Sequence, residues 1–381
     1  MQNYDLDNFE PAAKIVVIGV GGAGNNAVNR MIDEEIENVE FYVANTDKQA
    51  LATSKSSNRI ILGQEITGGL GAGGNPEIGK QAAEASEADI KEIVKGANMV
   101  FVAAGMGGGT GTGAAPIVAR IAKEAGALVI AIVTRPFTFE GKKRFVNSIE
   151  GLNNLKEQVD SIIVVSNDKL LMTAGNAPIS EAFNASDKVL AQSVKTVVNL
   201  ILLPAIINLD FADVKSTLKD SGVALIGFGL GSGPQRAKQA AEDALNSPLL
   251  EASMKGAKRA IVAVTCGPEV SLLDAQECVN LLTKATGQAI DVKFGVAIND
   301  QLSDEILVSV IASDFEDEIE FTTESTETFR ATSILPKEEI KNIIEETPAK
   351  AEEEADNKEE ETKEEVNDED ILPNFLKDLN L

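Results

Sequence analysis

The first half of the chain alternates short apolar runs with amphipathic stretches. Six runs rich in β-branched residues have the length and composition of buried strands, at residues 14–18, 41–44, 59–62, 98–104, 127–134 and 160–166. Amphipathic, helix-like segments lie between most of them. This alternation predicts an α/β fold with a mostly parallel sheet that is covered by helices on both faces.

The second half begins with one long helical pattern over residues 180–203, which Pro204 ends. Four further strands are predicted beyond it, at residues 223–229, 259–265, 293–298 and 305–311, with helices at 236–245 and 272–284. We therefore expect a smaller second α/β domain, joined to the first by the long helix.

Composition narrows the possible chemistry. The 381 residues include 60 acidic and 34 basic side chains, for a net charge of −26, so electrostatic repulsion disfavours nucleic acid as a partner. The sequence contains no histidine, which excludes histidine-based catalysis and histidine metal sites. Two cysteines, an acidic N-terminal segment and the absence of a long apolar run predict a cytoplasmic protein without membrane insertion.

The C-terminal segment differs in composition from the rest of the chain. Residues 314–381 carry 24 acidic and 7 basic side chains, which predicts a disordered acidic linker over residues 314–369. The final stretch, 370–381, is predicted to be a docking peptide for membrane-anchoring and regulatory proteins, through Ile371, Leu372, Pro373, Phe375 and Leu376. A frayed end with scattered apolar residues is the alternative.

A glycine-rich loop, residues 19–24, directly follows the first predicted strand and leads into a helix predicted to start near Asn25. Glycine lets the backbone approach an anion closely, and a helix N-terminus supplies unpaired N–H donors, so a phosphate is expected there. The spacing also fits a dinucleotide fingerprint, with Asp47 at the end of the next strand. An NAD(P)-binding oxidoreductase is therefore one hypothesis.

A second loop at residues 105–113 contains six glycines and precedes a helix predicted to begin at Ala114, with Pro116 in its first turn. Two amide-lined loops suit a triphosphate better than a dinucleotide. A third glycine-rich segment, 68–75, is expected to close over the terminal phosphate, with a flexible surface loop as its alternative.

The string GGGTGTG at residues 107–113 resembles the signature of the tubulin and FtsZ family. Neighbouring motifs within residues 12–315 resemble FtsZ as well: IGVGGAGNNAVNRM, NTDKQAL, GAGGNPEIGK, RPFTFEGKKR and NLDFADVK. The string ILPNFL near the C-terminus is a separate match. The resemblance implies a tubulin-like GTPase that polymerises head to tail in the division ring at mid-cell. It implies GTP or GDP as ligand, with Mg²⁺ held mainly by the nucleotide phosphates and no metal-ligating side chains.

The resemblance also implies a division of the chain into an N-terminal extension (1–11), a GTP-binding domain (12–178), a connecting helix (179–204) and a second domain (205–313). It assigns the ligand contacts to Gly21, Gly22, Ala23, Gly24, Asn25, Asn26, Ala72, Gly73, Gly107, Gly108, Gly109, Thr110 and Gly111 for the phosphates, Glu140 and Arg144 for the ribose side, and Asn167, Phe183 and Asp187 for guanine. Without the resemblance, the sequence predicts that Phe183 is a core residue and that Asp187 is a charged residue on the helix surface.

For hydrolysis the resemblance points to Asn208, Asp210 and Asp213, presented to the nucleotide of the next subunit, with the two aspartates on one helical face. The alternative is an N-capping aspartate followed by an exposed helix charge. A non-hydrolysing structural relative is disfavoured because both carboxylates are present. Leu203, Ala205 and Ala23 depart from the common family pattern, and Ala23 is expected to be tolerated unless its position needs a positive φ.

Overall fold

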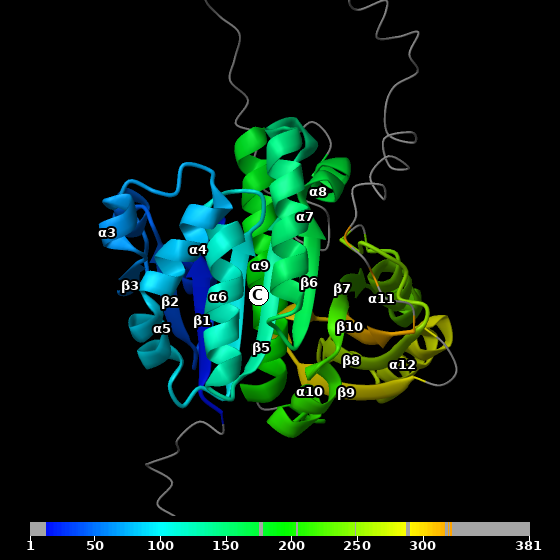
Figure 1. Ribbon diagram of the computed structural model, residues 1–381. Helices are drawn as coiled ribbons and strands as arrows, with labels where there is room; N and C mark the ends of the chain where they lie inside the picture. The colour runs from blue at the N-terminus through cyan, green and yellow to red at the C-terminus, as the bar shows by residue number, and fades with distance from the viewer. Residues whose placement is uncertain are drawn as a thin grey trace, which may run out of the picture. The chain divides into compact units, whose positions relative to one another are not determined.

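A single mixed sheet organises the protein. The computed structural model describes residues 13–174, 178–202, 205–247, 249–286 and 290–316, with Ile319 and Phe321. Within that part, the strand order is β3-β2-β1-β4-β5-β6-β7-β10-β8-β9 (Figure 1). The strands are β1 (Ile15–Val20), β2 (Glu40–Asn45), β3 (Asn58–Ile61), β4 (Met99–Gly105), β5 (Leu128–Arg135), β6 (Ser161–Ser166), β7 (Gly222–Gly231), β8 (Ala257–Cys266), β9 (Asp291–Ile298) and β10 (Ile306–Phe315). All ten predicted strands are confirmed, with ends shifted by a few residues.

The helices fall between these strands in the order that the amphipathic stretches predict. Their bounds are α1 (Gly21–Asp33), α2 (Lys48–Ala52), α3 (Gln64–Thr67), α4 (Pro76–Ala85), α5 (Glu87–Val94), α6 (Thr110–Glu124), α7 (Lys142–Lys156), α8 (Asn167–Ala174), α9 (Ile179–Leu202), α10 (Phe211–Leu218), α11 (Arg236–Leu245) and α12 (Leu272–Thr286). Short 3₁₀ turns occur at η2 (Thr138–Glu140), η3 (Gly233–Gln235) and η4 (Asp300–Leu302).

Strands β1 to β6 are all parallel to their neighbours, and β1, β4, β5 and β6 are buried almost throughout. Helices α1 and α9 pack together and against the sheet, while α4, α5, α6 and α7 form a second packed group (Figure 1). Because both faces are covered, these strands read as continuous apolar runs rather than as alternating patterns. The carboxyl ends of the strands meet at one edge, where the glycine loops follow.

The remaining strands continue the same sheet. Strand β7 pairs in parallel with β6, whereas β10 is antiparallel to both β7 and β8. Helices α11 and α12 pack on each other and on this part of the sheet, around a second apolar core. The α/β prediction is confirmed, and the antiparallel β10 is the exception in a mostly parallel sheet.

The long helix is confirmed as α9, one residue earlier than predicted. The predicted linker boundary at residue 314 is wrong, because β10 continues through Phe315, which pairs with Ala257, and Arg259 forms an ion pair with Asp314. Three further residues of the predicted linker, Glu316, Ile319 and Phe321, are described, and the Lys156 ammonium group donates to the Ile319 carbonyl at 3.4 Å. The N-terminal extension, the other linker residues and the docking peptide lie outside the described residues. No helix in the described ranges is long and apolar enough to cross a membrane.

Candidate nucleotide-binding site

The first glycine loop forms the opening turn of α1. The helix starts at Gly21, not near Asn25 as predicted, so the glycines themselves present the unpaired N–H groups of the helix end. Gly21 has φ +75°, and a Cβ on Gly24 would lie 2.3 Å from the carbonyl oxygen of Ala103. A Cβ on Gly22 would meet nothing within 4 Å, which leaves this turn open on one side. Asn26 is exposed on the same helix.

Asn25 and Ala23 do not behave alike at this turn. Asn25 is only 2% exposed, and with its amide nitrogen turned toward the loop it donates to the carbonyls of Gly19 and Gly21 at 3.0 and 2.9 Å. The position of Asn25 therefore favours a structural role, in which its side chain stabilises the conformation of the loop. Ala23 lies within α1 and is not among the described residues with positive φ, so a methyl group is tolerated there.

The second glycine loop forms the opening turn of α6 in the same way. This helix begins at Thr110, four residues before the predicted start, with Gly109 as its N-cap. Pro116 consequently lies inside the helix instead of in its first turn. The error has one cause at both loops: glycine is a poor helix former in general, but at a helix N-terminus its lack of a side chain exposes the backbone donors.

The three glycine-rich segments come together. A Cβ on Gly21 would lie 2.8 Å from the backbone nitrogen of Gly111, so the first two loops touch. A Cβ on Gly109 would lie 2.9 Å from the Cβ of Ala72, which places the segment containing Gly73 against the second loop. The N-termini of α1 and α6 therefore share one site, which is suited to several phosphates.

Two residues without a predicted role also connect these loops. The Thr46 hydroxyl, which is fully buried, lies 2.7 Å from the Thr110 hydroxyl. From α7, the Asn147 amide donates to the carbonyls of Gly74 and Gly107, each at 3.5 Å. Thr46 follows a predicted strand end and could have been considered, but nothing in the sequence marks Asn147.

An aromatic and polar group lies where a base could bind. Phe183, on the first turns of α9, is 41% exposed and packs edge-to-face with Phe137, with ring centroids 4.9 Å apart. Phe137 also stacks on Phe139, which is 60% exposed. Asn167 is buried and accepts a 2.8 Å hydrogen bond from the Ser186 hydroxyl. The exposure of Phe183 favours a stacking role over the core alternative.

Asp187 lies one turn after Phe183 on α9. Burial raises the pKa of its carboxyl group to about 7, and the nearby Arg30 guanidinium only partly opposes this shift. A carboxylate that has lost its water is a strong acceptor for paired N–H donors, such as those on one edge of guanine. This partly buried group does not fit the surface-charge alternative.

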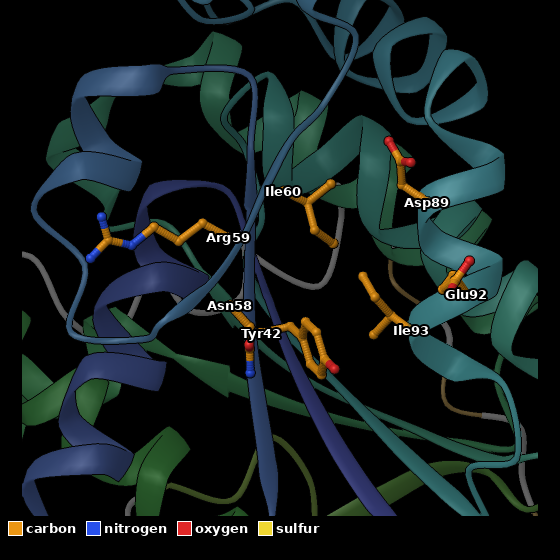
Figure 2. A pocket seen from close by; sticks show the side chains of 7 residues that line it. All are labelled: Tyr42, Asn58, Arg59, Ile60, Asp89, Glu92 and Ile93. Atoms are coloured by element: carbon orange, nitrogen blue, oxygen red, sulfur yellow. The ribbon is translucent and has the colours of Figure 1, made fainter.

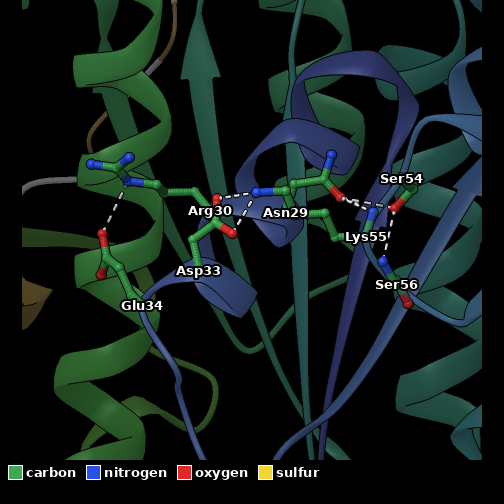
Figure 3. A network of polar contacts seen from close by, with 7 residues as sticks. All are labelled: Asn29, Arg30, Asp33, Glu34, Ser54, Lys55 and Ser56. Carbon is green, nitrogen blue, oxygen red and sulfur yellow. Dashed lines mark hydrogen bonds and ion pairs between the residues drawn. The ribbon is translucent and has the colours of Figure 1, made fainter.

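A polar network holds α1, which carries Arg30, against the connection between α2 and β3 (Figure 3). The Asn29 amide oxygen accepts from the Ser54 hydroxyl at 2.9 Å and from the Lys55 backbone N–H at 2.8 Å. Arg30 pairs with Glu34 at 3.2 Å. The Asn29 contacts thereby hold α1, whose first turn is the first glycine loop, against that connection.

Glu140 and Arg144, which are predicted to lie at the ribose, form an ion pair between η2 and α7. Glu140 also accepts a 2.9 Å hydrogen bond from the Phe137 backbone N–H, which ties the pair to the aromatic group. The backbone of Arg144 approaches the second glycine loop, since a Cβ on Gly107 would lie 2.7 Å from its carbonyl oxygen. The backbone of Arg144 thus adjoins the second glycine loop, while a ribose contact for either side chain stays a prediction.

Asp47 has a structural role. Its carboxylate caps α2 by accepting from the backbone N–H groups of Gln49 and Ala50 at 2.8 and 3.4 Å. A dinucleotide fold would instead use it to bind a ribose hydroxyl. This cap, together with the second glycine loop, removes the basis of the oxidoreductase hypothesis.

The predicted hydrolytic residues lie at the other end of α9. Asp210 is the N-cap of α10, not a member of that helix, and its side chain accepts from the Asp213 backbone N–H at 2.8 Å. The expectation that both carboxylates share a helical face is therefore wrong for Asp210. The exposed Asn208 accepts from the Ala205 backbone N–H at 2.7 Å, and Ile207 bridges to Val296 of β9. Leu203 lies outside the described residues.

A cavity of about 350 Å³ lies away from the glycine loops, between β2, β3 and α5 (Figure 2). It is lined by Tyr42, Asn58, Arg59, Ile60, Asp89, Glu92 and Ile93. No residue of the glycine loops contributes to it, and its two carboxylates would repel phosphate. We therefore place the functional site at the loops and not in this cavity.

The fold and the paired glycine loops define a nucleotide-binding α/β protein of the tubulin type. The GTPase-domain model of the Tubulin/FtsZ family matches residues 14–175, and the FtsZ C-terminal domain model matches residues 222–316. The chain is 46% identical over 336 residues to the cell division protein FtsZ of Mycoplasmopsis pulmonis, covering 88% of this chain and 86% of that relative. The chain belongs to the FtsZ family.

Solved structures agree with this assignment. An FtsZ dimer from M. jannaschii superposes with a TM-score of 0.77 at 42% identity, over 81% of this chain and 90% of that one. CetZ2 from Haloferax volcanii, solved as a protofilament, matches with a TM-score of 0.69 at 22% identity, over 84% and 98% of the two chains, and shows the shared fold.

Proposed function

We propose that this protein is a GTP-dependent cytoskeletal protein of cell division, which assembles head to tail and hydrolyses GTP between adjacent subunits. The three glycine-rich segments bind the phosphates, Glu140 and Arg144 lie at the ribose, and Asn167, Phe183 and Asp187 bind guanine. The family assignment and the convergence of the loops support GTP as the ligand.

The separation of Asp187 from the hydrolytic residues carries the proposal. Helix α9 continues from Asp187 to Leu202, which at about 1.5 Å per residue is roughly 22 Å. Helix α10, with Asp210 as its N-cap and Asp213 in its first turn, follows after the far end of α9. No hydrogen bond from the Asp187 end of α9 spans such a distance, which supports the proposal that these carboxylates act on a nucleotide bound to another copy.

In this mechanism one subunit binds and orients GTP, and its neighbour inserts Asn208, Asp210 and Asp213. The carboxylates orient and polarise the attacking water, while the helix N-termini of α1 and α6 stabilise the charge that develops on the phosphates. Mg²⁺ would neutralise phosphate charge and would be held mainly by the nucleotide phosphates. A head-to-tail contact of this kind builds an open filament.

The proposal extends to the parts of the chain that support assembly. We place a GTP-binding domain at residues 12–178, a connecting helix at 179–204 and a second domain from residue 205 to the end of β10 at Phe315. The terminal peptide would bind membrane-anchoring and regulatory division proteins at the cytoplasmic mid-cell site through Ile371, Leu372, Pro373, Phe375 and Leu376.

Dilution of the purified protein tests the shared site. Because each active site needs two copies, GTP turnover per molecule is expected to rise above a threshold protein concentration and to vanish below it. A specific activity that stays constant on dilution would contradict the proposal, whereas GDP binding by the same samples should not depend on protein concentration.

A further inference from the structure

The geometry points to Glu251 as a positioning residue for the base side of the nucleotide site, acting through Arg135 and Lys169. Glu251 belongs to the segment between α11 and β8, outside the matched GTPase domain. The inference rests on the proposed function, because it assumes that a guanine nucleotide occupies the site.

Arg135 is the first link. It ends β5, and its Nη1 atom lies 3.2 Å from Oε2 of Glu251, with both side chains about 15% exposed or less. The guanidinium also lies 5.4 Å from the ring centre of Phe145 on α7. Because water is largely excluded, this pair is less screened than an ion pair at the surface.

Lys169 is the second link. It lies on α8, two residues after Asn167, and its ammonium group donates to the backbone carbonyl of Leu250, the residue before Glu251. Burial lowers the pKa of Lys169, and the Glu251 carboxylate opposes that shift. The same short segment therefore contacts two separate elements that border the site.

Each element adjoins a residue proposed to contact the base, since α8 begins with Asn167 and the segment after β5 packs on Phe183. Phe137, which packs on Phe183, lies two residues after Arg135. Asp168, which precedes Lys169, accepts from the backbone N–H and the hydroxyl of Thr138 at 2.8 and 2.6 Å. A shift of the Glu251 segment would thus move the aromatic group and the Asn167 region together.

The ion pair is incompletely satisfied in this arrangement. Nε of Arg135 and Oε1 of Glu251 are both buried without a hydrogen-bond partner in the part of the chain that the structure describes. A closer approach would turn the single contact into a two-point pair, which is the stronger geometry. If nucleotide favours that approach, then by reciprocity the pair favours nucleotide.

The test is GDP affinity of the full chain, measured by titration at a protein concentration too low for assembly. Glu251→Gln keeps the side-chain shape, so we expect a loss of about fivefold or more. Discrimination between GDP and IDP, which lacks the 2-amino group, should also fall, because the base side is loosened. Glu242→Gln, which breaks an exposed ion pair with Lys238, is the matched control and should change neither quantity.

Two further measurements distinguish a positioning role of Glu251 from a purely structural one. They are thermal unfolding of the ligand-free variants and a double-mutant cycle that combines Glu251→Gln with Arg135→Lys. Positioning predicts that the two substitutions are non-additive in GDP affinity. If Glu251→Gln lowers the unfolding temperature but leaves GDP affinity and the GDP-to-IDP ratio at wild-type values, its role is structural and the inference is overturned. If the wild-type protein binds no GDP, the proposed function itself fails, and the inference with it.

Discussion

Asp210 and Asp213 cap each other across the start of α10. The Asp213 N–H donates to the Asp210 carboxylate at 2.8 Å, and the Asp210 N–H donates to the Asp213 carboxylate at 3.4 Å. Each carboxylate therefore has a structural role in its own chain besides the catalytic role that we propose. Substitutions at these positions have to separate the two.

Asparagine separates them, because it caps a helix about as well as aspartate does but carries no charge. We expect Asp210→Asn to unfold at nearly the wild-type temperature, while Asp210→Ala costs about 1 kcal/mol of stability. Both should lower GTP turnover sharply and leave GTP affinity unchanged. Phosphate-release assays and nucleotide titration measure these effects, and normal turnover in Asp210→Asn would mean that only the cap matters.

Asp213→Ala is expected to lower hydrolysis by orders of magnitude while GTP affinity is retained, because the nucleotide contacts lie at the other end of α9. Equal losses in binding and turnover would show that Asp213 belongs to the binding site. The same two assays decide between these outcomes.

The raised pKa of Asp187, about 7, predicts a specific dependence on pH. Guanine binding needs the carboxylate, so GDP affinity should fall as the pH drops through 7. The stability of the ligand-free protein is expected to change with pH in the opposite direction. Between about pH 4 and 7 the carboxyl group ionises in the unfolded state but keeps its proton in the folded state. This contribution therefore lowers the free energy of unfolding as the pH rises through that range, by at most about 1.4 kcal/mol per pH unit.

Asp187→Asn should remove both effects, and it should also change base preference. An amide donates where the carboxylate accepted, so GDP affinity is expected to fall by about 1–3 kcal/mol while xanthosine diphosphate, with a carbonyl at that edge, binds better. Competition titrations of both nucleotides at pH 6 and 8 measure this. Unchanged guanine preference would exclude Asp187 as the base-reading residue.

Gly21 and Gly22 offer a matched pair for the phosphate site. Alanine at Gly21 is strained by φ +75° and would lie 2.8 Å from the Gly111 nitrogen, so we expect a loss of stability of about 1–2 kcal/mol. Alanine at Gly22 has open space and a helical environment, so stability should be unchanged or higher. Nucleotide affinity should still fall, because the methyl group occupies phosphate space. Full affinity in Gly22→Ala would place the phosphates elsewhere.

The hydrophobic pattern was sufficient to predict the strands, because burial on both faces of the sheet leaves continuous apolar runs. It was also sufficient for α9, because one long apolar stripe marks that helix. It failed where backbone chemistry overrides propensity: the glycines before Asn25 and Ala114 form the first turns of α1 and α6. Contacts between distant segments could not be predicted either. The roles of Asn147 and Glu251 depend on side chains that meet only after folding, and single positions in one sequence carry no sign of this.

Complementation between two inactive proteins tests the shared active site most directly. Asp213→Ala retains the GTP site but cannot supply the full catalytic group, whereas Asp187→Asn supplies that group but binds GTP poorly. Mixed in equal amounts with GTP, they should form interfaces that join an intact nucleotide site to an intact Asp210–Asp213 pair. We predict a GTP turnover well above the sum of the separate proteins, and a mixture that equals that sum would contradict the account.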